Sequence, residues 1–265
     1  MPTALITGAS AGLGRALATE LANLGWRLVL TARGAQRLEQ VATGLPDPPS
    51  VTTIAGDVAD PAHRACLVSV INQIGALDLL VNNASTLGPT PLRPLAGLSP
   101  ADLSDVLAVN VIAPFALTAA LLPALTAARG VVLDISSDAG IEHYPEWGGY
   151  GASKAALDHL TLTFGVENLD IACYAVDPGD MRTDMQQAAF PGEDISDRTA
   201  PSAVVPALLG LISSRPPTGR YRAADIAAAL VACDEVARRN PAQRDCLASL
   251  ARRSLDPSRG SAVSA

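Results

Sequence analysis

The sequence predicts an α/β protein with a single parallel β-sheet of about seven strands, doubly wound, with helices on both faces. Short apolar segments alternate with longer segments of helical pattern, which is typical of parallel sheets. Apolar residues make up 49% of the 265 residues and aromatic residues only 3%, so the expected core is aliphatic, as strands buried on both faces require. The expected strands are residues 3–7, 26–31, 51–55, 77–81, 130–135, 169–176 and 219–223.

The first expected strand leads into a glycine-rich turn, Gly8-Ala-Ser-Ala-Gly12-Leu-Gly14, and then into a helix. Glycines let the backbone approach a pyrophosphate, and the helix N-terminus supplies free N–H groups and a partial positive charge. The turn therefore predicts a phosphate cradle. Its spacing differs from G-x-G-x-x-G, so a turn that only caps the helix is the alternative.

The second expected strand ends in Ala32-Arg33, without an acidic residue. An acid at this point would bind the ribose 2′-hydroxyl of NAD, whereas a cation suits the 2′-phosphate of NADP. We therefore expect NADP(H) to be preferred, with NAD(H) as the alternative. Arg33 could also be no more than a solvated residue at the start of the next helix.

Polar residues follow the third and fourth expected strands, at the sheet edge that faces the ligand crevice in this fold class. Asp57 comes after the third strand and could accept a hydrogen bond from an adenine amino group or cap the following helix. Asn82 and Asn83 come after the fourth strand, and their amides could tie neighbouring loops together.

Tyr150 and Lys154 are four residues apart at the start of a helical segment, so they share one face of that helix. A fixed cation beside a phenol favours the phenolate and lowers its pKa. The phenol could then exchange a proton with an alcohol or carbonyl oxygen. Such a pair also arises by chance on exposed helices, so the rest of the chain decides its meaning.

We expect one domain over residues 1–224 that contains the catalytic site, with a lid at about 184–202. A helical extension is expected over 225–253 and a disordered tail over 254–265. The net charge of −7 argues against a nucleic-acid partner, and the four cysteines and three histidines show no metal-ligand spacing. The chain offers no room for a signal peptide before the first strand, so a cytoplasmic location is expected. The apolar stretch 106–125 contains Asn110 and two prolines and is interpreted as a buried helix, not a membrane span.

Taken together, these motifs resemble those of the short-chain dehydrogenase/reductase family, whose fold is Rossmann-type. The resemblance covers residues 3 to about 224. It rests on Thr7-Gly8-x-x-x-Gly12-x-Gly14, Asp57, Asn82-Asn83-Ala84, Ser137 with Tyr150-x-x-x-Lys154, and Pro178-Gly179 with Thr183.

The resemblance implies a catalytic set of Asn110, Ser137, Tyr150 and Lys154. Tyr150 would be the acid/base and Ser137 would bind the same substrate oxygen. Lys154 would bind the nicotinamide ribose and lower the pKa of Tyr150, and Asn110 would hold a water beside Lys154. The implied cofactor contacts are Gly8, Ser10, Gly12, Leu13 and Gly14 at the pyrophosphate, Asp57 and Val58 at the adenine, Asn83 and Ala84 at the adenine ribose, and Pro178, Gly179 and Thr183 at the carboxamide.

The resemblance thus predicts an NADP(H)-dependent oxidoreductase that interconverts a carbonyl and an alcohol. An NAD-linked alcohol dehydrogenase and a non-enzymatic NADP(H)-binding regulator are the alternatives. The expected substrate wall consists of His143, Tyr144, Trp147, Met185 and Phe190. A homodimer or homotetramer is implied, with residues 106–125 and 152–164 as a possible interface. Three features depart from the family pattern: Ser85 in place of glycine, Ala11 without a cation, and about forty residues beyond the last strand.

Overall fold

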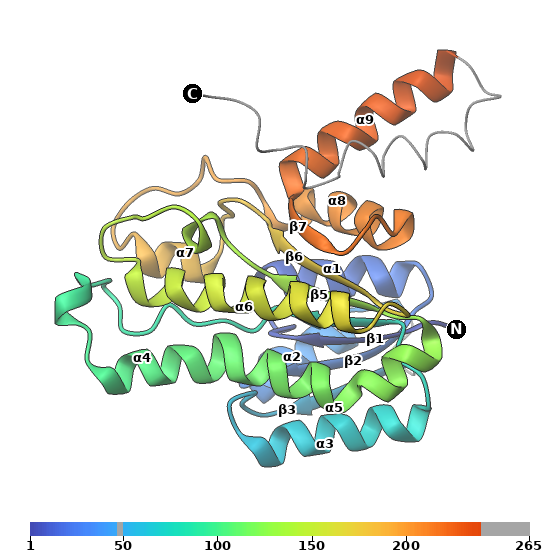
Figure 1. Ribbon diagram of the computed structural model, residues 1–265, viewed down its shortest axis with the longest axis horizontal. Helices are drawn as coiled ribbons and strands as arrows, with labels where there is room; N and C mark the ends of the chain where they lie inside the picture. The colour runs from blue at the N-terminus through green and yellow to red at the C-terminus, as the bar shows by residue number, and fades with distance from the viewer. Residues whose placement is uncertain (47–49, 240–265) are drawn as a thin grey trace.

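The computed structural model describes residues 1–46 and 50–239 as a three-layer α/β arrangement (Figure 1). Seven strands form one sheet. They are β1 (Thr3–Thr7), β2 (Arg27–Ala32), β3 (Val51–Ala55), β4 (Leu79–Asn82), β5 (Val131–Ile135), β6 (Ala172–Asp177) and β7 (Gly219–Arg222). Their order is β3-β2-β1-β4-β5-β6-β7 and every pairing is parallel, which confirms the predicted fold class.

β4 and β6 begin two and three residues later than the sequence pattern suggested, and β2 and β5 begin one residue later. Residues 77 and 78 form the approach to β4, where Leu77 N donates to Ala124 O and the Asp78 carboxylate accepts from Thr3 N. Residues 169–171 form a turn before β6, where Ile171 N donates to Asn168 O. Apolar side chains in these turns continue the core, so hydrophobicity alone extended both strands too far.

Helices cover both faces of the sheet. The helices are α1 (Gly12–Asn23), α2 (Ala35–Thr43), α3 (Pro61–Ile74), α4 (Pro100–Leu107), α5 (Ala113–Ala128), α6 (Gly148–Glu167), α7 (Asp184–Ala189), α8 (Pro201–Ser214) and α9 (Ala223–Arg239). One aliphatic cluster joins α1, α2, α8 and α9 to the sheet, and a second joins α3 and α5 to its other face.

The segment expected to be a buried helix is longer than predicted. Residues 100–128 are helical throughout, because a π-helical turn, η3 (Ala108–Ile112), connects α4 to α5. Within the described residues, this is the helix whose length and composition would let it cross a membrane, and 44% of its most apolar window is buried. Ile112 and Phe115 are exposed on it.

The C-terminal part begins as the sequence suggested. α9 packs on α8, where Leu230 lies against Gly210, and Ile226 is fully buried. The rest of the expected extension and the expected tail, residues 240–265, lie outside the described residues.

Candidate active site

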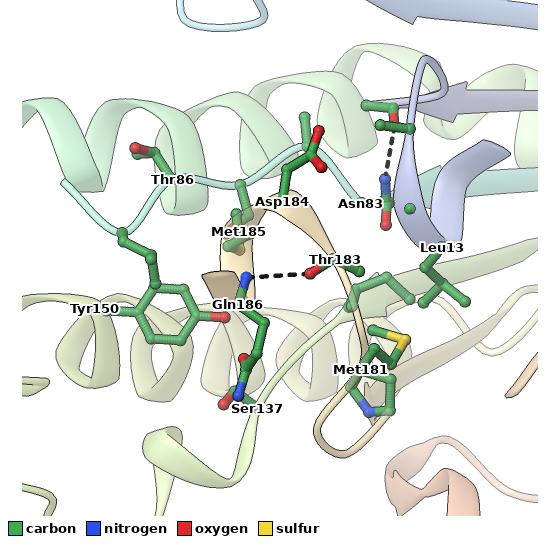
Figure 2. A pocket seen from close by; sticks show the side chains of 18 of the residues that line it. Leu13, Asn83, Thr86, Ser137, Tyr150, Met181, Thr183, Asp184, Met185 and Gln186 are labelled. Atoms are coloured by element: carbon green, nitrogen blue, oxygen red, sulfur yellow. Dashed lines mark hydrogen bonds between the residues drawn. The ribbon is translucent and has the colours of Figure 1, made fainter. Parts of the chain in front are cut away.

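The carboxyl ends of the strands open into one cavity of about 850 Å³. Figure 2 shows Tyr150, Ser137 and Gln186 gathered at one end of it, and Leu13 and Asn83 at the other. Of the residues predicted to bind cofactor, all except Gly14 line this cavity, as do Ser137, Tyr144, Trp147, Met185 and Phe190. Asn110 and His143 do not line it; His143 is exposed on the surface.

The glycine turn is shaped by its contact with the loop after β4. Gly8 has a φ of +65°, and a Cβ there would lie 2.7 Å from Asn83 Nδ2. That amide donates to Thr7 O (2.9 Å) and Gly8 O (3.1 Å). The Thr7 hydroxyl accepts from the backbone N–H groups of Asn83 and Ala84, both at 2.9 Å. The Asn-Asn-Ala motif therefore holds the turn against β4, and only glycine fits at position 8.

The start of α1 fits a pyrophosphate. Its N-cap is Ala11, which has no side chain to cap the first N–H groups, so these groups are available to an anion. Gly12 has a φ of +52° and faces the Thr183 side chain across the cavity. A dinucleotide pyrophosphate matches this glycine-lined, positively polarised helix end.

The opposite rim combines the ends of β2 and β3. Arg33 is exposed there, and Asp57 accepts a hydrogen bond from Ala59 N (2.9 Å), while Asp60 caps α3. Asp57 is therefore not the cap of α3. Arg37, which was not predicted, lines the same rim from the first turn of α2 and pairs with Asp184 at 3.1 Å. The usable signal was a second arginine close to Arg33 in the chain.

Ser137 and Tyr150 come from adjacent elements. Ser137 lies two residues after the end of β5 and caps a short 3₁₀ turn, where its hydroxyl accepts from Ala139 N (3.2 Å) and donates to Asp138 Oδ1 (3.1 Å). Tyr150 lies in the first turn of α6 and is 8% exposed. The hydroxyls of Ser137 and Ser85 hydrogen-bond to the Tyr150 side chain and act to lower its pKa.

Burial nevertheless raises the pKa of Tyr150 to about 12, with Asp177 and Asp138 adding to the rise. The pKa of Tyr150 in the protein chain by itself is therefore raised rather than lowered, and a lowering of this pKa by Lys154 stays a prediction. The Lys154 ammonium lies 5.4 Å from the centre of the Tyr150 ring and donates to Ile135 O (2.7 Å). Desolvation of the phenolate outweighs the serine hydrogen bonds.

Lys154 is itself deeply buried. Desolvation lowers the pKa of its ammonium to about 8, and the carboxylates of Asp158 and Asp134 partly oppose that change. Asp134 accepts hydrogen bonds from Asn82 (2.7 Å) and Thr161 (2.6 Å), and burial raises its pKa to about 6. Lys154 thus lines the cavity, with two buried acidic groups, Asp134 and Asp158, near enough to influence its pKa.

Asn110 lies in the π-helical turn and is fully buried. Its amide donates to Thr86 O and Ser153 Oγ, both at 2.9 Å. Its oxygen accepts from Ser85 Oγ (3.1 Å) and Thr86 N (2.8 Å). Asn110 therefore fixes the loop after β4 to α6, and a water link to Lys154 stays a prediction. Ser85, the departure from the family pattern, and Thr86 both line the cavity and connect Asn110 to its wall.

The loop after β6 forms one wall of the cavity. Asp177 accepts from Gly179 N (2.9 Å), and Thr183 caps α7 by accepting from Gln186 N (3.2 Å). Arg182 N donates to Thr199 O (2.9 Å), so the two ends of the expected lid are joined at its base. The lid residue Gln186, like Asp138 beside Ser137, lines the cavity and was missed by the sequence analysis.

The substrate end is largely aromatic. The Trp147 ring meets Tyr150 edge-on, with 5.7 Å between ring centres, and lies 6.0 Å from Phe190 of the lid. Tyr144 donates to Asp138 (2.9 Å) at the mouth. Among the described lining residues, the basic side chains other than Lys154 are Arg33 and Arg37, both at the far rim.

Comparison with known proteins agrees with this geometry. The family described as short chain dehydrogenase matches residues 2–194. The oxidoreductase YciK of Escherichia coli (strain K12), itself uncharacterized, is 33% identical over 81% of this chain and 88% of its own length. A short-chain dehydrogenase structure from Shigella flexneri 2a strain 301, complexed with NADP, has a TM-score of 0.78 at 31% identity, covering 84% of this chain and 96% of its own. A second, from Escherichia coli CFT073 with NADPH, has a TM-score of 0.77 at 31% identity, with the same coverage.

The chain therefore belongs to the short-chain dehydrogenase family and, as a member, is an oxidoreductase.

Proposed function

We propose that this protein is an NADP(H)-dependent oxidoreductase that interconverts a ketone or aldehyde with the corresponding alcohol. One observation carries the proposal: Ser137, Tyr150 and Lys154 converge at one end of the cavity whose other end has the glycine cradle and Arg33. A cofactor bound along the cavity would connect the two ends.

The preference for NADP(H) is supported by the rim residues and by the relatives with bound NADP and NADPH. Arg33 would bind the 2′-phosphate, and Arg37 lies near enough to assist. The glycine turn and α1 would hold the pyrophosphate, and Lys154 the nicotinamide ribose. Thr183 and the backbone after Gly179 would hold the carboxamide.

NADPH, when bound, supplies the hydride that adds to the carbonyl carbon. Tyr150 donates its proton to the carbonyl oxygen, and the Ser137 hydroxyl donates a hydrogen bond to the same oxygen. A Tyr150 pKa of about 12 keeps the proton on the phenol at neutral pH, as a donor requires. The Lys154 ammonium then stabilises the resulting phenolate. Asn110 would hold a water through which the proton is replaced from solvent.

The substrate class follows from the cavity wall. Trp147, Phe190 and Met185 offer an apolar surface. The acidic side chains that line the same part of the cavity are Asp138, Asp177, Asp180 and Asp184. A neutral, apolar ketone or aldehyde fits this wall, and an anionic substrate does not. We expect a small-molecule substrate and a cytoplasmic homo-oligomer. The exposed Phe115, whose ring centre lies 5.8 Å from that of Phe164 in a tilted arrangement, belongs to the face expected to form the subunit interface.

Two measurements test this proposal. NADPH and NADH are titrated against the protein by nicotinamide fluorescence, and a panel of apolar ketones and aldehydes is then screened for NADPH oxidation. Tighter NADPH binding with turnover is the expected result. Preference for NADH would favour an alcohol dehydrogenase, and NADPH binding without turnover of any carbonyl would favour a regulator.

A further inference from the structure

An ion pair outside the proposed catalytic set joins three elements of the active site. Arg220 on β7 donates through Nε to Asp158 Oδ2 (2.8 Å) and through a terminal nitrogen to the backbone oxygen of Ser137 (2.9 Å). Asp158 lies one helical turn after Lys154 on α6. A single guanidinium therefore links the loop that carries Ser137 to the helix that carries Tyr150 and Lys154.

The pair is poorly suited to be a mere stabilising contact. Its side chains are only 18% and 12% exposed. Burying an ion pair costs desolvation and often yields no more stability than apolar side chains of the same size. The planar, forked geometry of arginine, however, fixes two acceptors relative to each other, which a lysine ammonium does not.

We infer that Asp158 and Arg220 form a positioning pair, which holds Ser137 against α6 and balances the charge around Lys154. This inference rests on the roles proposed above for Ser137 and Lys154. Arg220 and Asp158 are positioning residues, because neither lines the cavity.

The charge around Lys154 comes from every element packed against it. The charged or titratable groups near Lys154 and Tyr150 are Asp134 on β5, Asp138 after it, Asp158 on α6, Asp177 on β6 and Arg220 on β7. Asp158 raises the pKa of Lys154, and Arg220 compensates the charge of Asp158. Removing Asp158 takes a negative charge away from the surroundings of Lys154, whereas removing Arg220 takes a positive charge away. The two changes therefore act on Lys154 in opposite directions.

The chain provides a direct probe of this effect, because Lys154 is its only lysine. Lysine labelled with ¹³C at Cε gives one lysine signal, whose shift reports the ionisation of Lys154 without any cofactor or substrate. Asp158→Asn should lower the measured pKa, and Arg220→Gln should raise it. The double variant should lie near the wild type, because it removes both charges. Arg222→Gln is the matched control: this exposed arginine lies two residues further along β7 and pairs with Asp177 (3.9 Å) rather than with Asp158, so its loss should shift the Lys154 signal much less than Arg220→Gln does.

A second readout follows the position of Ser137. Its backbone oxygen also accepts from Gly140 N (3.1 Å), so a loosened turn should exchange that amide faster in Arg220→Gln and in Arg220→Lys, but not in Arg222→Gln. With a carbonyl that the wild type turns over, both Arg220 variants should lose about ten- to hundredfold in kcat, with NADPH affinity unchanged. Arg220→Lys keeps the positive charge, so a loss of kcat in this variant would show that the forked geometry of arginine is required.

Lys154 signals that titrate alike in all variants, together with unchanged exchange at Gly140, would overturn the inference. If Arg220→Gln does not fold, Asp158→Asn and the double variant still test it. A wild type that fails to bind NADPH would refute the proposed function but not the positioning pair, because the lysine titration and the exchange measurement need no cofactor.

Discussion

The two ends of the cavity differ in which part of the chain forms them, backbone at one end and side chains at the other. The proposed cofactor end is formed by backbone: the Gly8 turn, the uncapped start of α1, and the amide of Asn83 that holds them. The proposed catalytic end is formed by buried charged side chains, with Lys154, Asp134 and Asp158 enclosed between β5 and α6. Substitutions at the first end should therefore act by distorting the backbone, and substitutions at the second end by removing reactive or charged groups.

The largest expected effect is at the catalytic end. Tyr150→Phe removes the proton donor while keeping the ring that packs on Trp147. We expect turnover of a carbonyl to fall by about 10²- to 10⁴-fold, with NADPH binding nearly unchanged. Tyr144→Phe removes a hydroxyl at the mouth of the same cavity and should reduce turnover far less, because that hydroxyl donates to Asp138 and is not the proposed proton donor. Comparable activity in Tyr150→Phe and the wild type would sink the assignment of the acid.

The cofactor end should be most sensitive at Gly8. Gly8→Ala puts a Cβ against Asn83 in a left-handed backbone, so we expect a loss of about 1–3 kcal/mol in unfolding free energy. NADPH binding should be lost with it. Urea unfolding and fluorescence titration measure the two effects. Gly97→Ala, whose nearest neighbouring atom is 4.0 Å away, should be nearly silent.

At the cofactor end, Arg33 should act through its charge rather than through the shape of the backbone. Arg33→Ala should weaken NADPH binding about ten- to hundredfold and leave NADH binding unchanged, because only NADPH has the 2′-phosphate. Isothermal titration of both cofactors measures this, with the exposed Arg93→Ala as control. Equal losses for both cofactors would move the phosphate contact away from Arg33.

The smallest expected effect concerns the exposed pair across the rim. Arg37 and Asp184 have side chains 61% and 79% exposed, so their pairing is screened by solvent. Asp184→Asn should tighten NADPH binding by less than about fivefold, because it frees Arg37 and removes a negative charge. Arg37→Ala should weaken binding by a similar factor. High salt should erase both effects, and effects that persist in salt would contradict a purely electrostatic role.

Whether a contact could be predicted from the sequence depends on how far apart its two residues lie along the chain. The fold and most of the cavity lining were predictable, because each motif is local: a turn with its helix, or Tyr150 and Lys154 on one helical face. Arg220 and Ser137 are 83 residues apart, and Arg37 and Asp184 are 147 apart. The sheet order brings the first pair together, since β7 lies two strands from β5. No local pattern contains that information.

The raised pKa of Tyr150 could not be predicted from the sequence, for a related reason. Spacing on a helix places a cation beside a phenol, but burial is a property of the whole fold. Gly149, Tyr150 and Lys154 are all buried, so desolvation dominates both groups. A motif therefore identified the residues but not the balance of free energies between them.

Deuterium transfer from the nicotinamide to the substrate is the direct test of the proposed hydride transfer. NADPH carrying deuterium at C4 of the nicotinamide, with each stereoisomer used in turn, is incubated with the protein and an apolar ketone that it reduces, and the alcohol is analysed by mass spectrometry. The account predicts that one stereoisomer gives deuterated alcohol in the wild type and that Tyr150→Phe gives almost none. An alcohol formed without deuterium from either stereoisomer would contradict direct hydride transfer in this cavity.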